Sequence, residues 1–248
     1  MISIINSCQF FGATVRGPLH MQSKTPNQDA WYGQKKRNSV FITVCDGMGS
    51  RTNASEGYQA ACKAVREAIR IWEKYPNSPT DYLLRFIKFI WEMKIAPLNP
   101  IDCYTTCLVA CVSANGRLSV VGLGDGMALI RKPDGQLITI IDRSTDFSNQ
   151  TKALGQPHKL GDWKVCNLDF FEPGMIVLLA SDGIADDLEP GKLSELIPWI
   201  TKEFSLLPPV KRTSSLHKTL RDWPTPFHQD DKTLALLYHP IQIEKNEL

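Results

Sequence analysis

Short apolar runs rich in β-branched residues, separated by turn signals, are the feature that most constrains the fold of this 248-residue chain. Runs of this length and composition favour buried strands. Asn115-Gly116 and Asp134-Gly135 lie between such runs and favour the positive φ angles of tight hairpins. The runs between about Thr105 and Ile141 are therefore expected to form an antiparallel meander. The predicted strands are Ile4–Ala13, Val40–Cys45, Thr106–Val112, Leu118–Leu123, Met127–Arg131, Leu137–Ile141, Trp163–Leu168, Met175–Ala180 and Leu234–His239.

Helices are predicted in pairs between the groups of strands. Apolar side chains recur with a 3.6-residue period over Ser55–Trp72 and over Asp81–Ile95, and weaker stripes cover Lys192–Phe204 and about Pro209–Leu220. This order favours an α+β fold in which helices cover antiparallel sheets, over a parallel sheet with alternating helices. The glycine motifs GxGxxG and GxxxxGK[ST] are absent. The length suits one domain spanning residues 1–248.

The near-neutral net charge gives no reason to expect a partner that binds through the overall charge of the chain. Lys and Arg number 28 against 26 Asp and Glu, which leaves a formal net charge of +2. We therefore predict neither a nucleic-acid nor a membrane partner. No run approaches the roughly 18 apolar residues of a membrane span, and the N-terminus lacks the basic region of a signal peptide. We expect a cytoplasmic protein, and nothing in the sequence demands more than a monomer.

The cysteines offer a weaker signal. There are seven, an odd number, and without an export signal free thiols are expected. Cys103, Cys107 and Cys111 are spaced by four residues and would share a face of a helix or a strand. A metal or redox site is one interpretation. The preferred one is that these are small buried apolar residues.

Five aspartates stand where strands are predicted to begin or end. A single Asp-Gly pair after a strand is usually a turn. Five such acids are harder to explain in that way, because carboxylates that converge repel one another and need a cation. Oxygen ligands suit Mg²⁺ or Mn²⁺, whereas the five scattered histidines give no zinc-ligand spacing. The five are Asp29, Asp46, Asp125, Asp182 and Asp230.

Acid-only metal sites often hold two ions about 3.5–4 Å apart and hydrolyse phosphate esters. The ions lower the pKa of a bridging water molecule and neutralise the phosphoryl oxygens. The chain shows no GxSxG elbow that would supply a covalent nucleophile. Phosphate ester hydrolysis is therefore the chemistry that the acids favour.

The order and residues of five fragments resemble those of the metal-dependent Ser/Thr protein phosphatases of type 2C, in particular their compact bacterial branch. The resemblance implies a four-layer αββα sandwich with two central antiparallel sheets flanked by helix pairs. It also implies hydrolysis of phosphoserine and phosphothreonine in proteins by a metal-bridging hydroxide, with a Ser/Thr kinase or its target as a possible partner. The fragments are Asn27–Ala30, Val44–Ser50, Gly122–Ala128, Leu179–Ile184 and Asp230–Leu234.

The resemblance assigns roles to the acids. Asp46 would bridge two Mn²⁺ or Mg²⁺ ions, with the Gly47 carbonyl on one of them. Asp182 and Asp230 would complete the binuclear site, and these two with Asp46 are the predicted catalytic residues. Asp29 would bind a metal directly or hold its water.

A weaker third ion is also implied, and Asp125 together with Asp182 would hold it. Arg16 or Lys24 would bind the substrate phosphate, because the arginine that the family places ahead of the first motif has no clear equivalent. Met48 replaces the histidine that animal members carry, so another group, with His20 as one guess, would protonate the leaving group.

Departures from the family keep two alternatives open. Gln28 stands where many members have Glu, and Gly126 replaces the usual Ser. These changes motivate a catalytically weak or inactive binding module as one alternative, although the metal acids are all present and activity is preferred. A phosphatase of a small phosphorylated molecule is the other alternative. The polar stretch Ser144–Gly161 is expected to form a short flap beside the active site that influences substrate choice, or else a solvated loop.

Overall fold

The computed structural model describes residues 4–75, 77–141, 152–223 and 229–241. The strands are β1 (Gln9–Val15), β2 (Asp29–Lys35), β3 (Ser39–Asp46), β4 (Cys107–Ser113), β5 (Leu118–Leu123), β6 (Met127–Arg131), β7 (Leu137–Ile141), β8 (Lys164–Leu168), β9 (Ile176–Ala180) and β10 (Lys232–Tyr238). The helices are α1 (Ile4–Ser7), α2 (Pro18–Ser23), α3 (Ala54–Trp72), α4 (Thr80–Ile95), α5 (Asp182–Ala185), α6 (Leu193–Phe204) and α7 (Pro209–Arg221).

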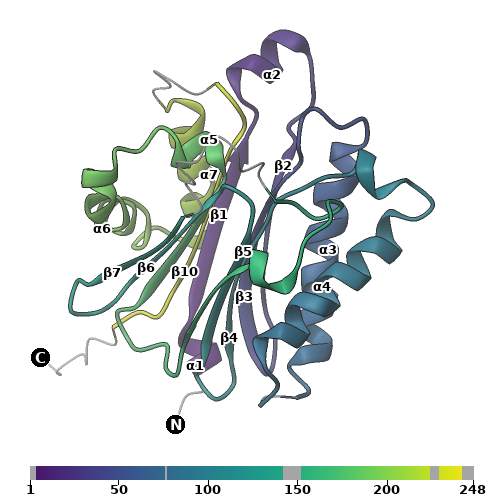
Figure 1. Cartoon of the computed structure of the whole chain (residues 1–248). Coiled ribbons are helices and arrows are strands. Elements are labelled where there is room, and N and C mark those ends of the chain that lie inside the picture. The colour runs from purple at the N-terminus through teal and green to yellow at the C-terminus, as the bar shows by residue number, and fades with distance from the viewer. Residues whose placement is uncertain (1–3, 76, 142–151, 224–228, 242–248) are drawn as a thin grey trace, which may run out of the picture.

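Two antiparallel sheets lie face to face at the centre of the described chain. One has the strand order β1-β10-β9-β6-β7 and the other β2-β3-β4-β5-β8. Helices α3 and α4 cover the outer face of the second sheet, and α6 and α7 cover the first (Figure 1). The fold is therefore α+β with four layers, which confirms the predicted architecture.

Strand β3 shows why the four layers hold together. Phe41 and Cys45 point to the cluster under α3 and α4, whereas Val40, Ile42 and Val44 point to the cluster between the sheets. Side chains alternate across a strand, so a strand covered on both faces is apolar at most positions, and the buried Thr43 satisfies its hydroxyl by donating to the Leu108 carbonyl. A third cluster lies between the other sheet and α6 and α7. Three apolar layers thus separate four layers of secondary structure.

The predicted meander is wrong at one point. Both hairpins form as expected, with Gly116 and Gly135 at positive φ. However, β5 belongs to one sheet and β6 to the other, so the chain changes sheet between Leu123 and Met127. Gly124 at a φ of +119° makes that change of direction. Apolar runs reveal strands, but they do not reveal to which sheet each strand belongs.

Other differences concern β2 (Asp29–Lys35), which was not predicted as a strand, and several short elements. The first predicted strand, Ile4–Ala13, divides into α1 and β1. The short helices α2 and α5 were not predicted, because one or two turns carry too little periodic signal. The segment from residue 142 to 151, which includes the first part of the predicted flap Ser144–Gly161, lies outside the described residues. The described part of the flap segment, from residue 152 onward, contacts the core through the pairing of Leu154 with Thr105.

The cysteines and helices allow two further statements about the described residues. All seven cysteines are free, and all except Cys166 are buried. Burial raises the pKa of Cys111 to about 12, as expected for an inert thiol in the core. None of the described helices combines the length and the apolar character needed to span a membrane.

Trp91 on α4 tests the layer between the helices and the sheet. Its side chain is fully buried, and its Nε1 donates to the Gly57 carbonyl of α3 at 3.0 Å. We expect Trp91→Ala to lower the free energy of unfolding by about 3–5 kcal/mol, because it leaves a cavity and removes the hydrogen bond to the Gly57 carbonyl. Phe89→Ala on the same helix is the control, since Phe89 is 61% exposed. Equal losses in urea denaturation of the two variants would contradict this packing.

Candidate metal centre

Two antiparallel strands place the first pair of acids side by side. Asp46 is the last residue of β3 and Asp29 the first of β2, and the two are direct partners in the register. Thr106 fixes the backbone of Asp46 from β4's side: its Oγ1 accepts from the Asp46 N–H at 3.0 Å, and its N–H donates to the Asp46 carbonyl at 2.8 Å. The Thr105 hydroxyl donates to the same carbonyl at 2.8 Å. Asp46 therefore stands on a rigid strand end.

The opposite sheet supplies the second pair of acids. Asp182 begins α5 directly after β9, and Asp230 precedes β10. Ser181 and Thr233 join these two strand ends, because the Ser181 N–H donates to the Thr233 carbonyl and the Thr233 N–H donates to the Ser181 hydroxyl, both at 3.0 Å. The Ser181 hydroxyl in turn donates to Asp29 Oδ2 at 2.6 Å. One hydroxyl thus links the acids of the two sheets.

Tight backbone packing fixes the turn around Asp230. A Cβ on Gly17 would collide with the carbonyl of Asp230, and a Cβ on Gly183 would collide with the carbonyl of Asp231. Glycine at both positions lets two segments approach the turn from either side. Asp231 also accepts from the backbone N–H groups of Gly17 at 2.7 Å and Gln28 at 2.6 Å. The buried carboxylate of Asp231 therefore ties the turn to the segment that precedes β2.

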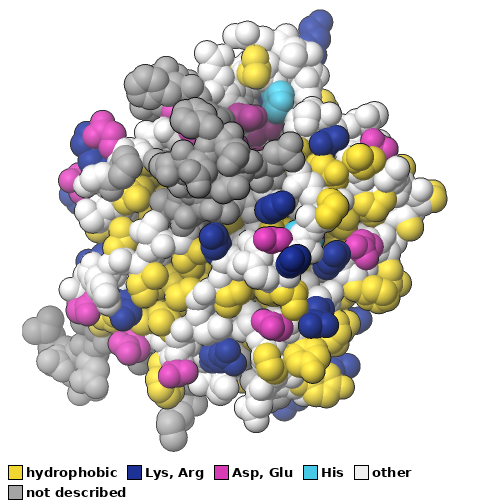
Figure 2. Space-filling view, in the orientation of Figure 1, with side chains coloured by type: hydrophobic (Ala, Val, Ile, Leu, Met, Phe, Trp, Pro, Cys, Tyr) yellow, Lys and Arg dark blue, Asp and Glu magenta, His cyan; other side chains and the backbone are white. Residues whose placement is uncertain are grey.

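The carboxylates form two neighbouring groups. In the first, oxygen atoms of Asp46, Asp125 and Asp182 all lie within 4.8 Å of one another. In the second, His20 and Asp231 lie with Asp230 within the same limit, and His20 Nδ1 is 2.9 Å from Asp231 Oδ2. Figure 2 shows acidic side chains next to a histidine in a recess of the molecular surface. The structure thus brings three of the predicted acids together and places Asp230 in the adjacent group.

The carboxylates of these acids repel one another, and their pKa values show the effect. Burial raises the pKa of Asp46 well above its ordinary value, and the charges of Asp29, Asp182, Asp125 and Asp230 raise it further. Burial also raises the pKa of Asp29 to about 7, although the hydroxyl of Ser181 lowers it in part. Carboxylates with raised pKa values in one place indicate a site whose charge is compensated by a bound cation.

The donor set fits magnesium or manganese. The first group offers only carboxylate oxygen atoms, half-buried and within reach of one ion, which are the ligands that these hard cations prefer. Asp29 and Asp230 lie close enough to act on the charge of Asp46 and extend the negative site beyond one ion. No cysteine belongs to either group of the described residues, so a thiolate zinc site is not indicated.

The predicted substrate-binding residues lie on the segment between β1 and β2. Arg16 is exposed, and its Nη1 contacts the Thr25 carbonyl at 3.5 Å. Lys24 is exposed at the end of α2 with a left-handed φ of 60°. The structure records no contact of either side chain with the acids among the described residues. Their role in substrate binding stays a prediction.

Several residues that complete the site were not assigned from the sequence. Ser181 and Asp231 adjoin two predicted metal acids, and that adjacency was the only available signal. Arg51 follows the Asp46 loop, and its guanidinium lies 4.1 Å from the ring centroid of Tyr104, a cation–π distance. The Tyr104 carbonyl accepts from the Met48 N–H of that loop at 2.9 Å. No pattern in the sequence reveals these tertiary contacts.

A family comparison interprets this geometry. The sequence model of the family described as protein phosphatase 2C matches residues 16–221. The chain belongs to the protein phosphatase 2C family. Four of the five predicted acids lie inside the matched range, and Asp230 lies beyond it. A comparison with curated protein sequences found no match.

Solved structures of phosphatases share the fold. The PPM Ser-Thr phosphatase MsPP from Mycobacterium smegmatis is 19% identical, with 93% of this chain and 97% of that one covered and a TM-score of 0.62. The catalytic domain of the phosphatase PstP, in complex with two manganese ions, is 18% identical over 94% and 99% of the chains, with a TM-score of 0.61. RsbX in complex with magnesium is 15% identical over 93% and 94%, with a TM-score of 0.56.

The pH dependence of stability tests the burial of Asp29. A carboxyl with a pKa of about 7 in the folded chain and about 3.9 unfolded keeps its proton in the fold. Its contribution to stability is therefore complete below about pH 4 and is lost as the pH rises through about 7. We expect this loss in metal-free protein to reach at most roughly 4 kcal/mol, since one pKa unit is about 1.4 kcal/mol.

Asp29→Asn should remove this pH-dependent part, because an amide can still accept from Ser181 but does not ionise. Asp169→Asn, at an exposed position, is the matched control. The measurement is urea denaturation of metal-free protein between pH 4 and pH 8. If Asp29→Asn and the wild-type chain lose stability in parallel over this range, Asp29 does not hold its proton in the fold.

Proposed function

We propose that this chain is a Mn²⁺- or Mg²⁺-dependent phosphatase that hydrolyses phosphoserine and phosphothreonine in proteins, acting as one domain over residues 1–248. The observation that carries the proposal is the group of Asp46, Asp125 and Asp182, whose carboxylate oxygens lie within 4.8 Å of one another in a member of the phosphatase 2C family. The manganese and magnesium complexes of PstP and RsbX support the choice of ions.

Each acid would have its own role in binding the metal ions. Asp46 lies within electrostatic reach of four other acids, which suits the role of a ligand shared by two ions. Asp182 would hold one ion, Asp230 would complete the set from the other sheet, and the Gly47 carbonyl would add an oxygen ligand. Asp125 with Asp182 would hold a weaker third ion.

When bound, the ions would lower the pKa of a water molecule to make a nucleophile near neutral pH and neutralise the phosphoryl oxygens. The chain's own residues fix the reacting groups. Thr105 and Thr106 hold the strand end that carries Asp46. Ser181 and Thr233 orient Asp29, which would accept a proton or position water. Arg16 or Lys24 would approach the substrate phosphate from the segment before β2.

The substrate is proposed to be a phosphorylated protein, such as a Ser/Thr kinase or its target. The cleft edge is formed by the segment before β2 and the loop after Asp46, where polar side chains such as Arg51 can meet a polypeptide. A small phosphorylated molecule and a non-catalytic binding role are the competing functions. Each gives a distinct result in the experiment below.

Hydrolysis of p-nitrophenyl phosphate and of a phosphothreonine peptide tests the proposal. We expect turnover that needs Mn²⁺ or Mg²⁺ and stops when EDTA is added. Asp46→Ala and Asp182→Ala should each lower kcat/KM by at least about 100-fold, because loss of an outer-shell partner alone costs 10- to 100-fold. Circular dichroism checks that the variants fold.

Asp134→Ala is the control, since Asp134 lies in an exposed hairpin turn between β6 and β7. Full activity of Asp46→Ala would contradict the proposal. Faster turnover of metabolite phosphates than of phosphopeptides would favour the small-molecule function. Calorimetric binding of Mn²⁺ without any turnover would favour the binding module.

A further inference from the structure

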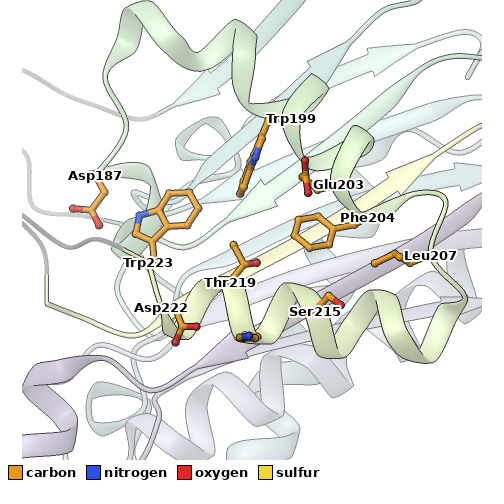
Figure 3. Close-up of a pocket in the computed structure, with 10 residues that line it drawn as sticks. Asp187, Trp199, Glu203, Phe204, Leu207, Ser215, Thr219, Asp222 and Trp223 are labelled. Atoms are coloured by element: carbon orange, nitrogen blue, oxygen red, sulfur yellow. The ribbon is translucent and has the colours of Figure 1, made fainter.

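The outer helical layer on the β1-β10 sheet contains a groove that the proposed reaction does not use. It lies between α6 and α7 and has a volume of about 960 Å³. Figure 3 shows its side chains turned toward one another from the two helices, with Trp199, Glu203 and Phe204 on α6 and Ser215 and Thr219 on α7. The groove therefore lies on a face formed by helices and not at the strand ends that carry the acids.

Aromatic rings form the wall of this groove. The ring centroids of Trp199 and Trp223 are 6.1 Å apart at 67°, and those of Trp199 and Phe204 are 6.0 Å apart at 85°. Trp199 stays 38% exposed although it touches both other rings. A tryptophan held in place with an open surface offers a large apolar contact at a small cost in entropy, and its face attracts cations.

The far end of the groove is apolar. Leu207 lines it, and in the view of Figure 3 it lies opposite the end that carries Trp223. Leu206 beside it is 92% exposed, and Val210 at the start of α7 is 84% exposed. Apolar side chains that extend a groove onto the open surface indicate contact with a polypeptide, which is longer than the groove itself.

Two acidic side chains, Asp187 and Asp222, lie near Trp223, and a third, Glu203, lies next to Phe204 (Figure 3). Asp187, Glu203 and Asp222 line the groove against a single base, Lys218. Both carboxylate oxygens of Asp187 are buried, and neither has a hydrogen-bond partner among the described residues. Asp222 contacts Arg221 Nε at 3.1 Å, but both partners are more than half exposed and solvent screens this pair.

Lys232 of β10 lies within electrostatic reach of Asp187 and offsets part of its charge, without a hydrogen bond between the two. The Lys232 Nζ donates to the Asp230 carbonyl at 3.1 Å. A buried carboxylate without a donor is costly, and an incoming cation would remove that cost. The charge of the groove therefore favours a ligand with positive groups.

The groove is already formed in the free chain. The buried guanidinium of Arg212 on α7 closes the turn between the two helices: its Nε donates to the Phe204 carbonyl at 3.1 Å, and its Nη2 donates to the carbonyls of Ser205 at 2.7 Å and Leu207 at 3.0 Å. A clamp of three charge-assisted hydrogen bonds fixes how far the helices separate at this end. A preformed groove avoids the cost of ordering on binding.

We propose that the α6–α7 groove binds a segment of a partner protein that carries arginine or lysine next to apolar side chains. The apolar side chains of the partner contact Leu206, Leu207 and Val210. Its cationic group lies over Trp199 or Trp223 and pairs with the acidic side chains. This interaction goes beyond the proposed phosphatase activity and does not depend on it.

Two-dimensional ¹H–¹⁵N NMR of the full chain tests the proposal, because each tryptophan gives one indole N–H signal. The signals of Trp199 and Trp223 are assigned with Trp199→Phe and Trp223→Phe. The probe is the peptide acetyl-Leu-Leu-Ala-Arg-Arg-amide, and the controls are its Glu-Glu counterpart and free arginine amide. Excess Mg²⁺ is present throughout to occupy the acids at the strand ends.

We expect the Arg-Arg peptide to shift both indole signals in a saturable way and to bind at least tenfold more tightly than the Glu-Glu peptide and arginine amide. Glu203→Gln with Asp222→Asn should weaken binding at least tenfold, as measured by calorimetry. These exposed positions tolerate substitution. Glu195→Gln, an exposed acid on α6 outside the groove, is the matched control and should leave affinity unchanged.

Each of the following outcomes would overturn the proposal. Unmoved indole signals would mean that the groove does not bind the peptide, wherever else it binds. Equal affinity of the acidic peptide, or of the double variant, would remove the charge argument. If arginine amide binds as tightly as the peptide, the ligand is a small cationic molecule. If the indole signals shift with protein concentration in the absence of peptide, and sedimentation shows dimers, the occupant is a second copy of the chain.

Discussion

The hydrogen bond from Ser181 to Asp29 is the contact on which the candidate metal centre depends. Ser181 ends a strand of one sheet and Asp29 begins a strand of the other, and the two groups are 2.6 Å apart. Because Thr233 also binds Ser181, the contact aligns three strand ends at once. The acids at those ends are then held together although their charges repel. The packing of the two sheets provides the energy that keeps them there.

The same contact explains why the acids are chemically useful. Carboxylates in water would stay ionised and apart. Here burial raises the pKa of Asp46 and Asp29, and each acid acts on the next. A site of this kind binds a divalent cation more strongly than a single exposed acid does, because the cation removes both the repulsion and the cost of burial. The rigid strand ends also mean that little reorganisation is needed on binding.

The outer layer on the other sheet shows a different use of burial. Arg212 is a buried charge that is fully engaged by backbone carbonyls, and it shapes the turn between α6 and α7. By contrast, the carboxylate oxygen atoms of Asp187 are buried and accept no hydrogen bond from the described residues. The first is structural, whereas the second leaves binding energy available at the surface of the groove. Asp187 lies just beyond α5, which begins with Asp182, so only a short segment of chain separates the groove from the metal centre.

The sequence alone determined most of the strands, the main helices and both hairpins, since these depend on local periodicity and on glycine at positive φ, but it did not determine β2. It also marked the aspartates at the strand ends as candidates by residue type. It did not determine that β5 and β6 lie in different sheets, which follows from how the Gly124 bend packs. Nor did it determine that Asp46, Asp125 and Asp182 form one group while Asp230 joins His20 and Asp231. That division, like the Arg51–Tyr104 contact and the α6–α7 groove, arises between segments far apart in the chain. Only tertiary packing fixes such distances, because local propensities carry no information about which surfaces meet.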